Sequence, residues 1–190
     1  LINGACADEF LTPESAAICA RECAAGRAPV TMANAERAIL ARLRAMREED
    51  LAPFDGGGEG LYHRFYDAVQ RETTIDGILA AAKSKRYAYA RLRRLLLAAY
   101  LGVTPEDIPQ RVPYLRVLAC NARGRELLRY MKTTAAAPVL TRSADVRRLD
   151  TDAQRLFALT ARAEEQYTLA YPSLAAAKPG SAWTTDPVIL

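Results

Sequence analysis

The sequence predicts a mainly α protein with a small α/β element: a helical bundle followed by a minimal two-strand βαβ unit and a C-terminal helix. At 190 residues and 51% hydrophobic composition, the chain is large enough to bury a core. Helical spacing of apolar residues gives way to a strand, helix, strand pattern within residues 113–142. The segment "PFDGGG" at 53–58 is the best candidate hinge. We therefore expect a helical linker or subdomain at 1–52 and a basic helical domain with the βαβ unit at 58–190.

Two helices are expected before this hinge. The segment "TPESAAICARECAAG" begins with Thr12 as N-cap and Pro13 at the first helical position, and it stops at Gly26. The apolar residues of a second helix, around 34–48, lie on one stripe: Ile39, Leu40, Leu43 and Met46. This second pattern is typical of a helix with one buried face.

Two more helices are expected directly after the hinge. Leu61, Phe65 and Val69 mark the third helix at helical spacing. Thr73 or Thr74 caps the fourth helix, whose apolar positions are Ile75, Ile78, Leu79 and Ala82. Together with the preceding pair, these helices would form the predicted bundle.

The segment "KSKRYAYARLRR" at 83–94 holds six basic side chains and two tyrosines and runs into an amphipathic helix that ends at Gly102. In an unbroken helix, one face would align Lys83, Tyr87, Arg91 and Arg94. The alternative is a helix junction at 84–88, which would form a basic corner from Lys85, Arg86 and Tyr87. Tyr87 and Tyr89 cannot both face the same way, and we expect Tyr87 to be the exposed ring and Tyr89 to be buried.

Positive charge is concentrated in residues 83–148. This region has 15 Lys and Arg residues against 4 Asp and Glu residues, whereas residues 1–82 have 8 against 13 and residues 149–190 have 3 against 5. A local surplus of this size attracts polyanions. Nucleic acid is the first candidate partner, and an acidic membrane surface or protein is the second.

The βαβ unit is predicted from two strands and the helix between them. "PYLRVLAC" at 113–120 alternates as a strand does, Asn121 is placed to cap the helix "ARGRELLRYMK", and "PVLTR" at 138–142 forms a second strand, parallel to the first. The start of this helix can bind a phosphate through free amides, with Arg123 and Arg125 beside them. A last helix is expected at about 151–167, and the tail from Pro172 onward is expected to be irregular.

Other residue types give little sign of catalysis or metal binding. The cysteines, Cys6, Cys19, Cys23 and Cys120, stand where small apolar residues would serve, which indicates a reducing cytoplasm. Cys19 and Cys23 lack the further ligands that zinc needs, and the chain has one histidine, His63. The sequence contains no apolar run long enough for a membrane span, and its start, which is not a methionine, suggests a fragment of a longer protein.

Five segments carry a family resemblance: "GEGLYHR" at 58–64, "KSKRYAYARLRR" at 83–94, "PYLRVLACNARGRELL" at 113–128, "PVLTR" at 138–142 and "TTDPVI" at 184–189. In order and spacing they resemble the C-terminal half of the bacterial tRNA(Met) cytidine acetate ligase family, formerly described as predicted nucleotidyltransferases. The resemblance implies an enzyme that activates acetate with ATP and acetylates N4 of the wobble cytidine of elongator tRNA(Met). It also implies that the N-terminal catalytic domain, with its ATP and Mg, is absent from this chain.

No catalytic, cofactor-binding or metal-binding residue is therefore expected here. The residues expected to bind RNA combine the charge pattern with the family's basic motif, and they are Lys83, Lys85, Arg86, Tyr87, Arg91, Arg94, Arg116, Asn121, Arg123 and Arg125. The sequence departs from the family at Ala88 and Ala90, where the family is associated with threonine. The expected partners are tRNA, elongator tRNA(Met) above all, and the chain's own nucleotidyltransferase domain, with no membrane and with a homo-oligomer left open.

Three function classes remain open. The first is a tRNA-binding accessory domain of the ligase. The second is a structural or dimerisation module that braces the catalytic domain without touching RNA. The third is a catalyst in its own right, for which the sequence offers no set of catalytic residues. Basic side chains on an open face would favour RNA binding, and basic side chains held in internal ion pairs would favour bracing.

Overall fold

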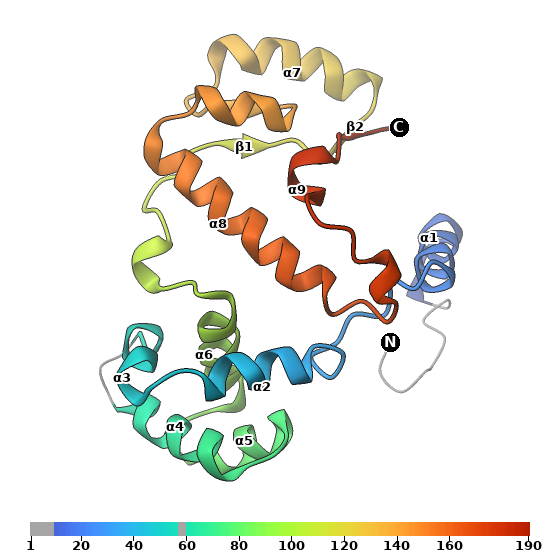
Figure 1. The fold of residues 1–190 in the computed structure, drawn as a ribbon. Coiled ribbons are helices and arrows are strands. Elements are labelled where there is room, and N and C mark those ends of the chain that lie inside the picture. Colours follow the sequence, from blue (N-terminus) through green and yellow to red (C-terminus); the bar gives the residue numbers. More distant parts are fainter. Residues whose placement is uncertain (1–9, 57–59) are drawn as a thin grey trace. The chain divides into compact units, whose positions relative to one another are not determined.

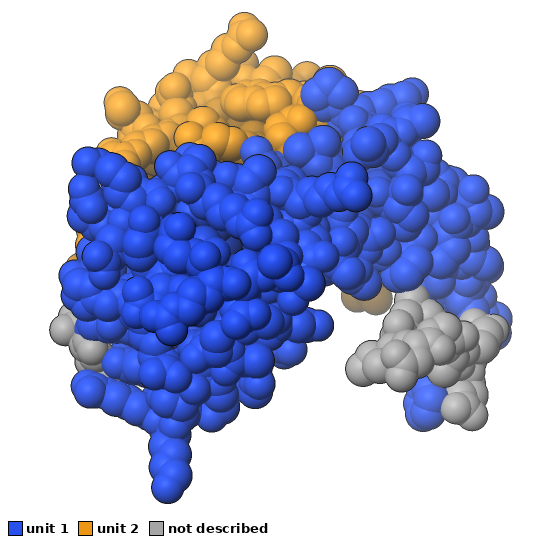
Figure 2. All heavy atoms as spheres, turned by 60° about the horizontal axis from the view of Figure 1, so that its bottom comes forward, with its two compact units in different colours: residues 1–103, 166–179 blue, residues 104–165, 180–190 orange. Residues whose placement is uncertain are grey.

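The computed structural model describes residues 10–56 and 60–190 (Figure 1). The chain divides into two compact units, unit 1 with residues 1–103 and 166–179 and unit 2 with residues 104–165 and 180–190 (Figure 2). The structure is mainly helical with small parallel strand pairs, which confirms the broad fold class. The division expected at 53–58 stays a prediction, and residues 57–59 of that hinge lie outside the described residues, as does Cys6.

Unit 1 begins with helix α1 (Pro13–Ala24), which Thr12 caps by accepting a hydrogen bond from the Ser15 amide. The helix expected around 34–48 is shorter in the structure, where this stretch divides into α2 (Glu36–Arg44) and a separate short helix, α3 (Glu48–Leu51). The division occurs at Arg47, whose extended backbone donates its N–H to the Asp50 carboxylate at 2.9 Å. This hydrogen bond lowers the pKa of Asp50.

The core of unit 1 is formed by α2, α4 (Leu61–Arg71), α5 (Ile75–Ala82) and α6 (Tyr89–Leu101), which pack against one another (Figure 1). Thr74 is the cap of α5 and accepts a hydrogen bond from the Gly77 amide. Helix α6 ends at Gly102, which adopts a left-handed conformation with φ of 69°. The largest fully buried side chains here are Phe65, Ile39, Leu43, Leu51, Leu61, Ile78, Leu79, Leu92, Leu96 and Val69.

Helices α5 and α6 are separate, so the unbroken helix over the basic segment is wrong and the helix junction is confirmed. The guanidinium of Arg64, on α4, donates to the carbonyls of Ala82 at 2.8 Å, Ala81 at 2.9 Å and Lys83 at 3.3 Å. These carbonyls have no amide partner further along a helix that stops here. Arg64 therefore stabilises the end of α5 and fixes where the basic segment leaves it.

A buried carboxylate joins the start of α4 to α6. The Asp55 side chain is 2% exposed, and its Oδ2 accepts the Leu61 amide at 3.0 Å. Its Oδ1 accepts a hydrogen bond from Arg91 Nη2, on α6, at 3.3 Å. Gly60, the N-cap of α4, has no side chain to cap the helix, so Asp55 takes that role from a distance.

Unit 2 contains two pairs of very short parallel strands. The strand expected at 113–120 is divided into β1 (Leu115–Arg116) and β2 (Ala119–Cys120). Helix α7 (Ala122–Thr134) connects this region to β3 (Val139–Leu140), which pairs with β1. A turn of 3₁₀-helix at Ser143–Arg148 then leads to α8 (Thr151–Thr168), close to the expected range.

The expectation of an irregular tail from Pro172 is wrong. The tail contains a short 3₁₀-helix at Leu174–Ala176, α9 (Ser181–Thr184) and β4 (Val188–Ile189). Strand β4 pairs with β2, where the amides of Val188 and Leu190 donate to the carbonyls of Leu118 and Cys120, each at 3.0 Å. The tail is thus ordered by partners far away in the sequence, which its own composition does not reveal.

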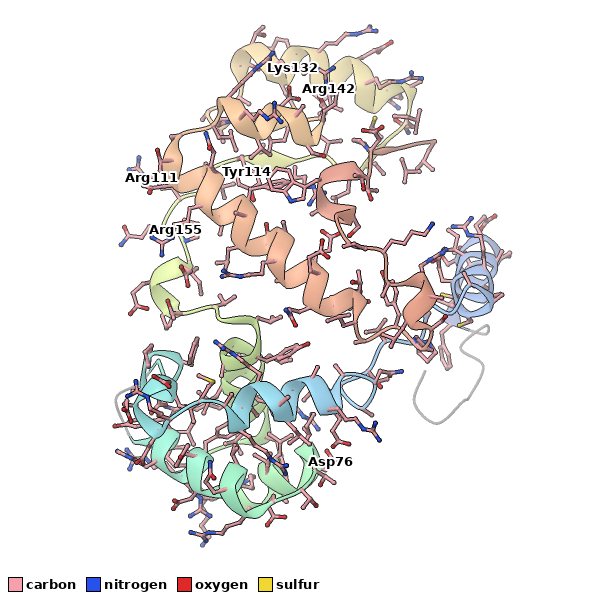
Figure 3. All side chains as sticks on the ribbon, viewed as in Figure 1. Asp76, Arg111, Tyr114, Lys132, Arg142 and Arg155 are labelled. Carbon is pink, nitrogen blue, oxygen red and sulfur yellow. The ribbon has the colours of Figure 1, made fainter. Side chains whose placement is uncertain are left out.

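Phe157 of α8 is the centre of the core of unit 2. Its ring centroid lies 4.7 Å from that of Trp183 and 6.1 Å from that of Tyr114, which Figure 3 labels. Other buried residues of this cluster are Leu140, Val146, Leu149, Ala153, Ala161 and Ala182. This small core holds β1, β3 and α9 against α8.

Asn121 caps α7 as expected, with its Oδ1 accepting the Gly124 amide at 2.9 Å. We predict that Asn121→Ala destabilises the protein by about 1 kcal/mol, because one amide of the first turn loses its partner. Asn121→Ser, which keeps a capping oxygen, should retain most of the stability. Urea unfolding measures both variants, and an equal loss from both would contradict the capping role.

Removal of the Asp55 carboxylate should cost far more. Asp55→Ala leaves the buried Leu61 amide without its acceptor and removes the Asp55 carboxylate from Arg91, and we expect a loss of about 2–4 kcal/mol. Asp67→Ala, which removes an exposed partner of Arg71 at 3.5 Å, should cost at most about 0.5 kcal/mol. Urea unfolding followed by circular dichroism compares the two, and similar small losses would show that the buried pair does not hold the unit together.

Candidate nucleic-acid interface

The basic segment 83–94 forms a corner between α5 and the first turns of α6. Lys83 leaves α5 with extended backbone, and Ala88 enters α6 in the same conformation. The Ser84 hydroxyl accepts the Tyr87 amide at 3.2 Å, which closes the turn between them. The corner is therefore held at both ends and in the middle, and its side chains project from a defined backbone.

Tyr87 and Tyr89 exchange the roles expected of them. Tyr87 is 7% exposed and belongs to the core of unit 1, whereas Tyr89 is 43% exposed. The guanidinium carbons of Arg86 and Arg91 lie 5.7 and 5.4 Å from the centroid of the Tyr87 ring. The expectation of an exposed Tyr87 was wrong because it assumed a continuous helix, whereas the turn at Ser84 directs this ring inward.

Several expected RNA-binding cations have structural partners instead. Arg91 is 28% exposed and donates to buried Asp55. The Lys83 ammonium donates to the Ser84 carbonyl at 2.6 Å and lies 5.9 Å from the centroid of the Tyr89 ring. Arg91 and Lys83 thus hold the corner in shape and are poorly available to a ligand.

Four other cations of the corner are exposed to solvent. Lys85, Arg86, Arg93 and Arg94 all have exposed side chains. Within the described residues, Lys85, Arg93 and Arg94 have no ion-pair partner, whereas Arg86 contacts the Tyr87 ring. Arg93 was not among the expected RNA-binding residues, although it lies beside Arg94 in the same charge run. The corner therefore presents unneutralised positive charge to solvent.

In unit 2, Arg116 differs from the other expected RNA-binding cations because its side chain bonds to groups of its own unit. It is 29% exposed, and its Nη2 donates to the Ala182 carbonyl at 2.9 Å. Its Nη1 lies 3.8 Å from the Glu164 carboxylate, and its guanidinium carbon lies 5.3 Å from the centroid of the Phe157 ring. Arg116 therefore joins β1, α8 and α9, and its charge is largely used inside the unit.

The remaining expected residues of unit 2 lie at the start of α7. Asn121 uses its side chain for the cap, and the side chains of Arg123 and Arg125 are exposed. Arg129 and Lys132 extend the same helix with two more exposed cations. Neither was expected to bind RNA, although their spacing from Arg125 at i+4 and i+7 marks one helical face.

The described residues show no cluster of three or more His, Cys, Asp or Glu side chains that could hold a metal ion. His63 Nδ1 lies 2.5 Å from the Glu48 carboxylate on an exposed surface. Burial raises the pKa of the Tyr100 phenol. Among residues 10–56 and 60–190, no helix has the length and apolar character that a bilayer crossing needs.

Known proteins resemble this chain in sequence. A tRNA(Met) cytidine acetate ligase of Syntrophomonas wolfei is 28% identical over 187 residues, which cover 94% of this chain and 45% of that protein. The enzyme of the same name from Kosmotoga olearia is 37% identical over 131 residues, covering 67% of this chain and 31% of that protein. The chain thus spans less than half the length of these curated relatives.

Solved structures resemble it as well. The crystal structure of apo Thermotoga maritima TmcAL matches with a TM-score of 0.88 and 25% identity, covering 95% of this chain and 46% of that one. A second form of that protein, bound with alpha-thio ATP, matches with a TM-score of 0.89 and 25% identity, over 95% and 47% of the two chains.

The family model described as HIGH Nucleotidyl Transferase matches residues 3–181. This match corrects the expectation that the chain is a C-terminal half lacking the nucleotidyltransferase part, because the nucleotidyltransferase model itself extends over nearly the whole chain. The chain belongs to the HIGH nucleotidyl transferase family.

Proposed function

We propose that this chain binds tRNA through the exposed cations of its two units. The observation that carries the proposal is the surplus of positive charge in residues 83–148 together with the exposure of its side chains. In unit 1 the proposed phosphate contacts are Lys85, Arg86, Arg93 and Arg94, and in unit 2 they are Arg123 and Arg125. Such contacts supply affinity and depend strongly on salt, because binding releases counterions from the RNA.

Tyr89 takes the role first expected of Tyr87. Its exposed ring lies at the start of α6, with the Lys83 ammonium 5.9 Å from the ring centroid. Unpaired bases of RNA stack on exposed aromatic rings, which contributes affinity with little sequence preference. Tyr89 is therefore the proposed stacking platform of the corner.

The names of the relatives indicate the reaction that tRNA binding would serve. We propose that the chain takes part in acetylation of a cytidine of tRNA(Met), with elongator tRNA(Met) as substrate and the wobble cytidine as acceptor. ATP is the proposed energy source, supported by the alpha-thio ATP bound in the Thermotoga maritima structure. The proposed location is the cytoplasm. No described residue is assigned to ATP, Mg or the acetyl transfer.

A structural or dimerisation module is the second candidate. The internal bonds of Arg91 and Arg116 favour it, because both spend their charge inside their own unit. The exposed cations Lys85, Arg93 and Arg94 favour RNA instead, since bracing would leave them without a use. Measurements of tRNA binding by variants of Arg91 and Arg116 and by variants of Lys85, Arg93 and Arg94 therefore separate the two functions.

Lys85→Ala and Arg94→Ala should each weaken tRNA binding and reduce the magnitude of the log–log salt slope by about one, because each removes one phosphate contact. Filter binding of purified tRNA(Met) across a salt series measures both quantities. Arg37→Ala, an exposed arginine of α2 outside the basic segment, is the matched control and should change neither. Wild-type affinity in both variants at every salt concentration would favour the structural module.

The two tyrosines should respond in opposite ways. Tyr89→Ala should cost about 1–3 kcal/mol of tRNA binding through lost stacking and leave the salt slope nearly unchanged. Tyr87→Ala should lower the melting temperature, because it removes a buried ring from the core. Tyr167→Ala, at an exposed tyrosine outside the basic segment, should leave tRNA binding unchanged. Undiminished tRNA binding by Tyr89→Ala would remove the stacking role.

A further inference from the structure

Unit 2 contains a basic pocket that brings together residues from segments far apart in the sequence. Its cavity has a volume of about 410 Å³ and lies between α7, the end of β3 and the tail that carries β4. Lys132 of α7 and Arg142, two residues after β3, both line it (Figure 3). Ligand pockets of proteins have volumes of about 300–1,000 Å³, so this one is large enough for a small organic group.

Four cations line this pocket against one carboxylate. Arg125, Arg129 and Lys132 follow one another along α7 at i, i+4 and i+7 and share one face of the helix, while Asp186 of the tail is the lone acidic group of the lining. Among the described residues, none of these three cations has an ion-pair partner. Arg142 has only a long contact of 3.8 Å with Asp145. The pocket thus holds positive charge that its own unit does not neutralise, which favours an anion.

Apart from Thr141, the rest of the lining is mostly apolar. Val117, Leu128, Pro187 and Ile189 contribute the apolar surface, with Cys120 beside them. The wall formed by the tail is fixed by the β2–β4 pair, through the hydrogen bond from the Leu190 amide to the Cys120 carbonyl. A ligand that combines an anionic group with a flat apolar ring matches such a lining. A nucleotide has both, with phosphate and base joined through the sugar.

We propose that this pocket binds a nucleotide of a single-stranded RNA segment, with phosphates on the cations and the base against the apolar wall. From Arg125 to Lys132 the helix rises by about 10 Å at 1.5 Å per residue, which exceeds the reach of one phosphate group. A strand with successive phosphates uses this whole row, whereas a free nucleotide uses only part of it. The inference rests on the proposed function and names the part of the RNA that unit 2 holds.

The test uses a fluorescent single-stranded oligoribonucleotide of about six nucleotides and the full chain. The double variant Arg129→Ala/Lys132→Ala should weaken its binding about tenfold and reduce the salt slope by about 1.4, because a single strand loses about 0.7 per phosphate contact. Arg147→Ala, an exposed arginine of unit 2 that does not line the pocket, is the matched control and should bind as wild type. Unchanged binding by the double variant would overturn the proposal.

Cys120 provides a second measurement that needs no variant. Bound oligonucleotide should slow alkylation of Cys120, which lines the pocket, while Cys19 and Cys23 of α1 react at the same rate as in its absence. Equal rates at Cys120 with and without oligonucleotide would place the ligand elsewhere and overturn the proposal. ATP added alone tests whether a free nucleotide is the ligand instead. Protection of Cys120 by ATP but not by the oligonucleotide would assign the pocket to a free nucleotide and contradict binding of an RNA strand.

Failure of this inference is distinct from failure of the proposed function. If the chain binds tRNA and loses affinity in Lys85→Ala but not in Arg129→Ala/Lys132→Ala, only the pocket assignment is wrong. If the chain does not bind tRNA at any salt concentration, the proposed function fails first.

Discussion

The buried carboxylate of Asp55 is the constraint on which unit 1 depends. It replaces the cap that Gly60 cannot provide at the start of α4, and it receives the guanidinium of Arg91 from α6. Because a buried charge is tolerated only when it is paired and hydrogen-bonded, these helices must stay in one arrangement to keep it satisfied. Arg91 in turn covers the Tyr87 ring, so the position of the basic corner follows from that pair.

The cations of the basic region thereby separate into two groups. Arg91 and Arg116 donate to a carboxylate or a carbonyl of their own unit, where they join several elements. The cations left exposed, such as Lys85 and Arg94, can meet a phosphate backbone without loss of an internal bond. This division explains how so basic a segment remains folded: its structural charges are neutralised locally, and the remaining charges lie in solvent of high dielectric constant.

Local signals in the sequence predicted the caps at Thr12 and Asn121, the end of α6 at Gly102 and most of the buried positions, because each depends on residues within one or two turns. Features that depend on partners distant in the sequence were not predicted. The tail was expected to be irregular because a two-residue strand such as β4 shows its identity only when paired with β2. Asp55 was interpreted as part of the glycine-rich segment expected to act as a hinge. Its hydrogen-bond partner, Arg91, lies 36 residues away in the sequence. Tyr87 was misplaced because the choice of ring depended on a helix that does not continue through Ser84.

The most direct test of the central claim is photo-cross-linking of the chain to tRNA(Met) that carries photoreactive uridines, with the attached peptides identified by mass spectrometry. The account predicts cross-links in the corner at 84–94 and in α7, where the exposed cations lie. It also predicts that high salt abolishes them, because counterion release drives the binding. Cross-links confined to α1–α4, or cross-links that persist unchanged at high salt, would contradict it.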